Sequence, residues 1–145
     1  MISQTVPTMP VPAPALTSLA RARVALNEAA AAGSAGERYA RAHVAALRAT
    51  AAVLAVRTRP TSRHRQRNAW ALLTQVAPEF TEWATFFAAG ATKRAAAEAG
   101  LSRAVTDREG DVLLRDSERF LHLVERAVGV LPDTTSANVG WPADA

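Results

Sequence analysis

The sequence predicts an all-α protein: a bundle of four to five helices, mostly antiparallel, with disordered termini. Three observations support this fold class. Apolar residues, many of them alanine, recur at the three- and four-residue spacing of amphipathic helices. No β-branched run alternates with polar residues, and no hairpin dipeptide separates two such runs. The connections between helical segments are short, which favours antiparallel neighbours.

The length of 145 residues fits one domain with two irregular ends. Met1–Ala15 carries four closely spaced prolines and is predicted to be a disordered Pro/Ala-rich arm. Residues 16–131 form the predicted helical bundle, and residues 132–145 a flexible tail. Trp141 is unusual in such a tail, because a tryptophan there can dock back on the core or on a partner.

The first two helices are predicted on either side of a glycine-containing turn. One covers about Leu16–Ala31, with Thr17 or Ser18 as its cap. The next covers about Gly36–Arg57 and ends before Pro60, since the residue before a proline disfavours helical geometry.

The second half of the bundle has stronger start and stop signals. Asn68 can cap a helix that Pro78 then interrupts, and the helical pattern restarts there and continues to Gly100. Thr106–Glu109 has the spacing of a capping box and opens the last helix. Gly129 is a suitable residue to end it.

Composition excludes several kinds of chemistry. The chain has no cysteine, so disulfides, thiolate metal sites and cysteine nucleophiles are excluded, which fits a cytoplasmic location. No apolar run is long enough to span a bilayer, and the start lacks the features of a secretory signal. No metal site or cofactor is predicted, because metal-ligand spacings and glycine-rich phosphate loops are missing.

Positive charge gathers in one connector. The formal net charge is +4, and the stretch from Arg57 to Trp70 carries five of the seventeen basic residues. Without them, the thirteen acidic residues would outnumber the bases. Arg63, Arg65 and Arg67 alternate, so an extended loop would direct them to one side as nucleic-acid contacts. The other interpretation is a solvated linker.

The last helix brings an arginine and a histidine onto one face. Arg115 and His122 are seven residues apart, nearly two helical turns, and Arg119 and Arg126 flank them. An arginine that holds a phosphate beside a histidine that moves protons suits RNA cleavage through the ribose 2′-OH. The alternative is a solvated face whose charged residues are ordinary helix neighbours.

Arg38 and His43 offer a second arginine–histidine pair. They lie about 140° apart on a helix, so their side chains are not expected to meet. His43 falls on the apolar face of its helix, and we expect a core histidine with a hydrogen bond across the bundle. His64, in the basic connector, is expected to be exposed.

Three segments together resemble a small actinobacterial branch of the HEPN superfamily: ERYARAHVAALRATAAVLA, NAWALLTQVAPEFTEWATFFAAGATKRAAAEAG and AVTDREGDVLLRDSERFLHLVE. The resemblance covers about Leu16–Leu131. It implies an up-and-down bundle that commonly dimerises. Many HEPN proteins are ribonucleases that use an Arg-x4–6-His motif on a late helix at the dimer cleft, with a polar residue after the arginine.

Arg115, Asp116 and His122 match that motif, and the resemblance implies roles in phosphate binding, orientation and acid/base chemistry respectively. Arg38 and His43 match by spacing alone, with Tyr39 in the polar position. The sequence thus favours a cytoplasmic HEPN domain, expected to be a homodimer, that binds RNA or a nucleotide. Whether it is also a metal-independent endoribonuclease is left open by the sequence. The alternative is a non-catalytic module that binds a cognate protein partner.

Overall fold

The structure is a computed structural model, and it describes residues 10–58 and 68–131. The proline-rich start, the basic connector and the tail therefore lie largely outside the described residues. The helices are α1 (Ala13–Ala31), α2 (Ala35–Arg57), α4 (Ala69–Val76), α5 (Thr81–Ala89), α6 (Ala91–Glu98) and α7 (Asp107–Val128). One turn of 3₁₀ helix, η1 (Pro78–Phe80), precedes α5. Over these two ranges no strand occurs, and the predicted all-α class is confirmed.

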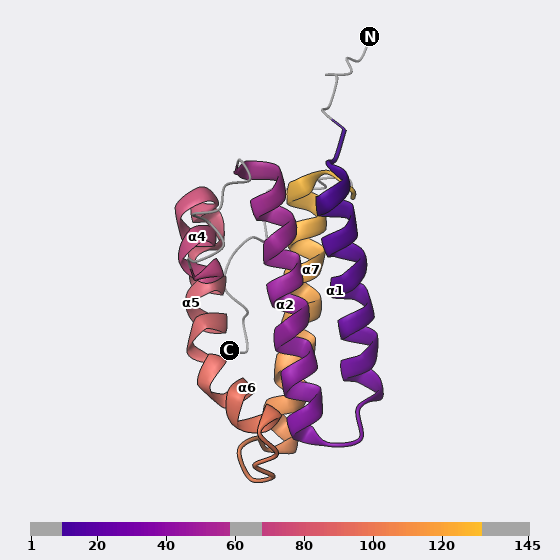
Figure 1. Ribbon diagram of the computed structural model, residues 1–145, viewed down its shortest axis with the longest axis vertical. Helices are drawn as coiled ribbons and strands as arrows, with labels where there is room; N and C mark the ends of the chain where they lie inside the picture. Colours follow the sequence, from indigo (N-terminus) through magenta and orange to yellow (C-terminus); the bar gives the residue numbers. More distant parts are fainter. Residues whose placement is uncertain (1–9, 59–67, 132–145) are drawn as a thin grey trace.

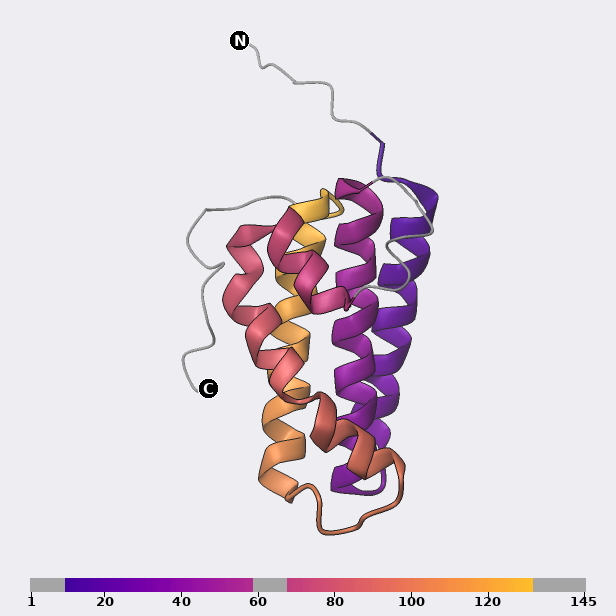
Figure 2. The same cartoon turned by 60° about the vertical axis from the view of Figure 1, so that its left-hand side comes forward.

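The helices form an up-and-down bundle of four runs, in which three short helices, α4, α5 and α6, make up the third run. α1 and α2 form an antiparallel hairpin, the run α4–α6 returns in the opposite direction to α2, and α7 returns again (Figure 1). Figure 2 shows α4, α5 and α6 following one another along one side of the bundle. As a result α2 and α7 are parallel neighbours whose first turns meet. A Cβ added to Gly110 would lie 3.1 Å from the carbonyl oxygen of Ala35.

Local capping signals were predicted correctly for α4 and α7. The Asn68 side chain accepts a hydrogen bond from the Trp70 N–H, 2.8 Å away, at the start of α4. Thr106 and Glu109 form the reciprocal capping box of α7. Gly129 ends that helix in the left-handed conformation, with φ of 94°. Each signal depends on residues within one helical turn, which is why the sequence is sufficient to reveal it.

Two helix boundaries differ from the prediction. α1 begins at Ala13 with Pro12 as its N-cap, so neither Thr17 nor Ser18 caps it. Prolines are tolerated here because the first N–H groups of a helix have no partner within the helix. The single helix expected up to Gly100 is divided at Gly90 into α5 and α6. A Cβ at Gly90 would lie only 2.7 Å from the hydroxyl of Tyr39 on α2, so glycine allows the close approach at this bend.

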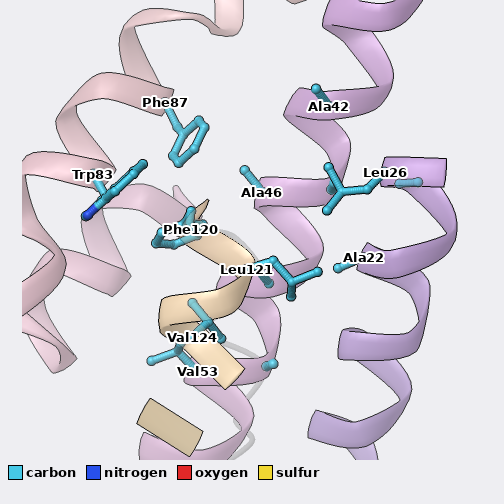
Figure 3. Close-up of a cluster of buried hydrophobic side chains, with 14 of the residues drawn as sticks. Ala22, Leu26, Ala42, Ala46, Val53, Trp83, Phe87, Phe120, Leu121 and Val124 are labelled. Carbon is cyan, nitrogen blue, oxygen red and sulfur yellow. The ribbon is translucent and has the colours of Figure 1, made fainter. Parts of the chain in front are cut away.

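Two kinds of packing build the core. The α1–α2 contact is rich in buried alanine, including Ala22, Ala25, Ala42 and Ala46, and small side chains let the two helices approach closely. On the other side an aromatic cluster joins α5 to α7. Phe87 and Phe120 have ring centroids 5.1 Å apart, and Trp83 lies 5.4 Å from Phe120. Figure 3 shows Phe120 directed toward this cluster and the adjacent Leu121 directed toward α1, beside Ala22.

Candidate nucleic-acid interface

A groove runs along the outer face of α7. It has a volume of about 450 Å³ and is lined by Arg115, Glu118, Arg119, His122, Leu123 and Arg126. Three arginines and a histidine thus share a continuous surface with a single acidic side chain. We call these six residues the α7 basic groove.

The amphipathic pattern of α7 places these side chains outside the bundle. Leu113, Phe120, Leu121 and Val124 are buried against the other helices. Arg115, Arg119 and His122 occupy the opposite side and are exposed to solvent. This confirms the expected exposure of the Arg115 and His122 face, and leaves the roles of those residues to be tested.

Arg119 lies between Arg115 and His122 on the helix surface. Its position is four residues after Arg115 and three before His122, so it is a direct neighbour of both. Arg115 and His122 themselves are about 10 Å apart along the helix axis, at 1.5 Å per residue. Arg119 and Arg126 were not among the predicted site residues, although the same helical spacing identifies them.

Asp116 does not face the groove. Its side chain is fully buried, on the side of α7 that packs into the bundle. The Nε atom of the exposed Arg115 lies 3.6 Å from its Oδ1 atom. A substrate in the groove therefore cannot touch this carboxylate directly, and any orienting effect would act through Arg115.

Two acidic residues near the groove form ion pairs with arginines on other helices. Glu118 pairs with Arg23 on α1, with 3.6 Å between their charged atoms. Asp111, which lies one helical turn before Arg115, is bound by Arg38 on α2 at 3.0 Å. Within the two described ranges, Arg119 and Arg126 have no acidic partner. The groove consequently keeps an excess of positive charge, which suits an anionic ligand.

The second arginine–histidine pair is structural. Arg38 donates to the carbonyl oxygens of Ala29 and Ala32, at 3.1 and 3.0 Å. It thereby provides hydrogen-bond donors for carbonyl groups at the C-terminal end of α1. His43 lies inside the bundle, and its Nε2 donates to the carbonyl oxygen of Phe87 at 2.8 Å. The two side chains have different neighbours, as their angular separation predicted.

His43 is held in its neutral form. Only 1% of its surface is exposed, and its ring meets those of Trp70 and Phe87 edge-on. Burial lowers the pKa of His43, with a further lowering by Arg94, against opposing effects of the Phe87 carbonyl and Glu98. Its Nδ1 is buried and has no hydrogen-bond partner among the described residues, so protonation would add an unsatisfied donor.

This environment predicts a loss of stability in mild acid. Because the pKa of His43 is below 6.5 in the folded chain, its contribution is complete above pH 6.5, where the unfolded chain is also neutral. Below that pH the unfolded chain binds the proton first, and the free energy of unfolding falls by up to about 1.4 kcal/mol per pH unit. Urea unfolding between pH 7.5 and 5 measures this slope. His43→Gln should flatten it, and an unchanged slope in that variant would assign the effect to other groups.

A second, acidic hollow on the described surface has the wrong charge for a phosphate. It encloses about 660 Å³ between the start of α2, α6 and the segment before α7. Glu28, Glu37, Glu98 and Asp107 line it together with a single arginine, Arg41, which is already paired with Glu28. Charge therefore selects the smaller α7 basic groove as the candidate site.

The predictions about the basic connector and about metal binding are limited by which residues the structure describes. Arg63, Arg65, Arg67 and His64 lie outside the described residues, so their role as nucleic-acid contacts stays a prediction. Among the residues that the structure describes, no three histidine or acidic side chains gather where they could hold a metal ion.

Comparison with protein-family models now adds to this geometry. The model of the SAV_6107-like HEPN family matches residues 29–125. The chain belongs to this family. The matched range runs from the last turn of α1 to Glu125 and contains the whole Arg115–His122 segment of this HEPN domain.

The other two comparisons found no relatives of this HEPN domain. No curated protein matches the sequence significantly, and neither does any solved structure. The family-model match confirms the HEPN family, and the structure confirms the all-α fold class. An actinobacterial source stays a prediction.

Proposed function

We propose that this HEPN domain binds RNA through the α7 basic groove. The observation that carries the proposal is the gathering of Arg115, Arg119 and Arg126 around His122 on one exposed surface. From the first to the last of these arginines, the surface extends about 16 Å along the helix. Guanidinium groups arranged in a row can neutralise successive phosphates of one strand. A free nucleotide would engage only part of this length, so affinity should increase with oligonucleotide length.

Salt dependence tests this proposal quantitatively. The logarithm of the affinity for a single-stranded RNA should fall linearly with the logarithm of the salt concentration, with a slope of about −0.7 per neutralised phosphate. Changing Arg115, Arg119 and Arg126 to alanine together should make the slope less steep by about 2, as measured by fluorescence anisotropy. Arg48→Ala, which removes an exposed arginine from α2, is the control. The same slope in the triple variant and the control would contradict the proposal and favour a protein-binding module.

Metal-independent RNA cleavage is the second candidate function, and the exposure of His122 between arginines favours it. A neutral imidazole can take the proton of a ribose 2′-OH, which then attacks the adjacent phosphorus. Arginine side chains stabilise the charge that develops on the phosphate oxygens. The leaving 5′ oxygen needs a proton, and His122 of a second chain would supply it in a homodimer. The homodimer and any cognate protein partner stay predictions.

The location also stays a prediction. In the parts of the chain that the structure describes, no helix combines the length and apolarity needed to cross a membrane. The cytoplasmic location continues to rest on the sequence.

A further inference from the structure

A smaller groove lies beside the other end of α7, between that helix and α5–α6. Its volume is about 320 Å³. Its apolar lining comes from Tyr39, Phe86, Val112 and Leu113, and two cations, Lys93 and Arg108, lie at its edge. We call it the α6–α7 groove. It differs in residues and in apolar character from the α7 basic groove.

We propose that the α6–α7 groove binds the C-terminal segment of the same chain, residues 132–145, with the Trp141 side chain among its apolar residues. Trp141 is the one aromatic residue of that segment. An indole combines a large apolar surface with an N–H, which suits a groove lined by Phe86 and Val112 and edged by charged groups. Lys93 and Arg108 add favourable cation–π contacts.

The C-terminal segment is long enough to reach from the end of α7 back to the α6–α7 groove. The described residues end at Leu131, just beyond α7, and Val112 lies about 24 Å back along the helix from its end at Val128, at 1.5 Å per residue. The ten residues from Leu131 to Trp141 span up to about 33–36 Å when extended. Residues 1–9 contain no aromatic side chain, so they offer no equivalent anchor.

Charge selects the same segment. It contains Asp133 and Asp144 and no basic residue. Asp144 follows Trp141 by three residues, about 10 Å of extended chain, which brings it within reach of Lys93 or Arg108. Glu109, the acidic residue of the groove, is already paired with Lys93. The arginine-rich connector of residues 59–67 would instead be repelled by these cations.

Tryptophan fluorescence tests the proposal in the full-length chain. Of the three tryptophans, Trp70 and Trp83 are 5% and 0% exposed, so acrylamide quenching reports mainly on Trp141. We expect Trp141 to be protected in the wild type. Val112→Glu should raise the quenching constant of Trp141 to that of a free peptide of residues 132–145. The Trp141→Phe variant gives the part of the fluorescence and of its quenching that comes from Trp70 and Trp83.

Val24→Glu is the matched control, because it makes the same change at an exposed position on α1, remote from the groove. Val112 is itself partly exposed, and circular dichroism of both variants checks that the bundle stays folded. Two results would overturn the proposal: a wild-type Trp141 already as quenchable as the free peptide, or equal effects of the two substitutions. Protection that increases with protein concentration would also overturn it, since it would show docking on a second copy.

Lys93 allows an independent measurement because it is the chain's single lysine. A carbodiimide activates carboxylates and joins them to a nearby amine as an amide, with loss of water. Mass spectrometry should find Lys93 linked to Asp144 within one chain, and Val112→Glu should remove this link. Finding Lys93 linked to Glu109 but never to Asp144 would count against the proposed position of the tail.

Discussion

RNA cleavage by the His122→Ala variant should be about 10²- to 10⁴-fold slower than by the wild type, the usual contribution of a positioned acid or base. RNA affinity should change little, because Arg115, Arg119 and Arg126 remain in the α7 basic groove. The measurement is the single-turnover rate with a labelled oligonucleotide, at a protein concentration that saturates binding.

Glu118→Gln is the matched control for this prediction, since it alters an exposed neighbour in the same groove whose carboxylate is paired with Arg23 on α1. The wild-type rate should persist in EDTA, and the product should carry a 2′,3′-cyclic phosphate. If His122→Ala leaves the cleavage rate unchanged, His122 is not the acid or base of the reaction. Wild-type RNA binding without cleavage would leave the domain as a binding module.

The second large effect concerns stability. Arg38→Ala should lower the free energy of unfolding by about 2–4 kcal/mol, because hydrogen bonds made by charged groups contribute about 1.5–3 kcal/mol each and are not fully additive. The loss comes mainly from the carbonyl groups of Ala29 and Ala32, which end α1 without another side-chain cap. Urea unfolding at neutral pH measures it.

Asp111→Asn separates the two roles of Arg38. The Asp111 side chain is 65% exposed, so the ion pair with Arg38 should contribute less than about 1 kcal/mol. A large loss in Asp111→Asn together with a small loss in Arg38→Ala would contradict this account. Normal RNA binding by the Arg38→Ala variant, measured where it is folded, is also expected because Arg38 lies outside the α7 basic groove.

The candidate site was only partly predictable. Helical periodicity was enough to place Arg115 and His122 on one exposed face, since that depends on their spacing within one helix. The motif also suggested Asp116 as a site residue, and the structure shows its carboxylate buried beneath the surface. The position of Asp116 beside Leu113 and Phe120 on the helix surface was a signal for this burial.

Most of the fold was contained in local sequence. The caps at Asn68, Thr106 and Gly129 were identified correctly because each depends on a few adjacent residues. The bend at Gly90 was missed, and the Tyr39 hydroxyl that lies against Gly90 comes from a helix far away in the sequence.

The sequence by itself determined which segments are helical, where most of them begin and end, and that one face of the last helix is basic. Only the tertiary structure decided that α2 and α7 run parallel, that Arg38 joins α1 to Asp111, and that Glu118 faces Arg23. The physical reason is the range of the interactions. Helix formation and capping involve residues within about one turn, whereas Arg38 and Asp111 are 73 positions apart and meet only when the bundle has formed.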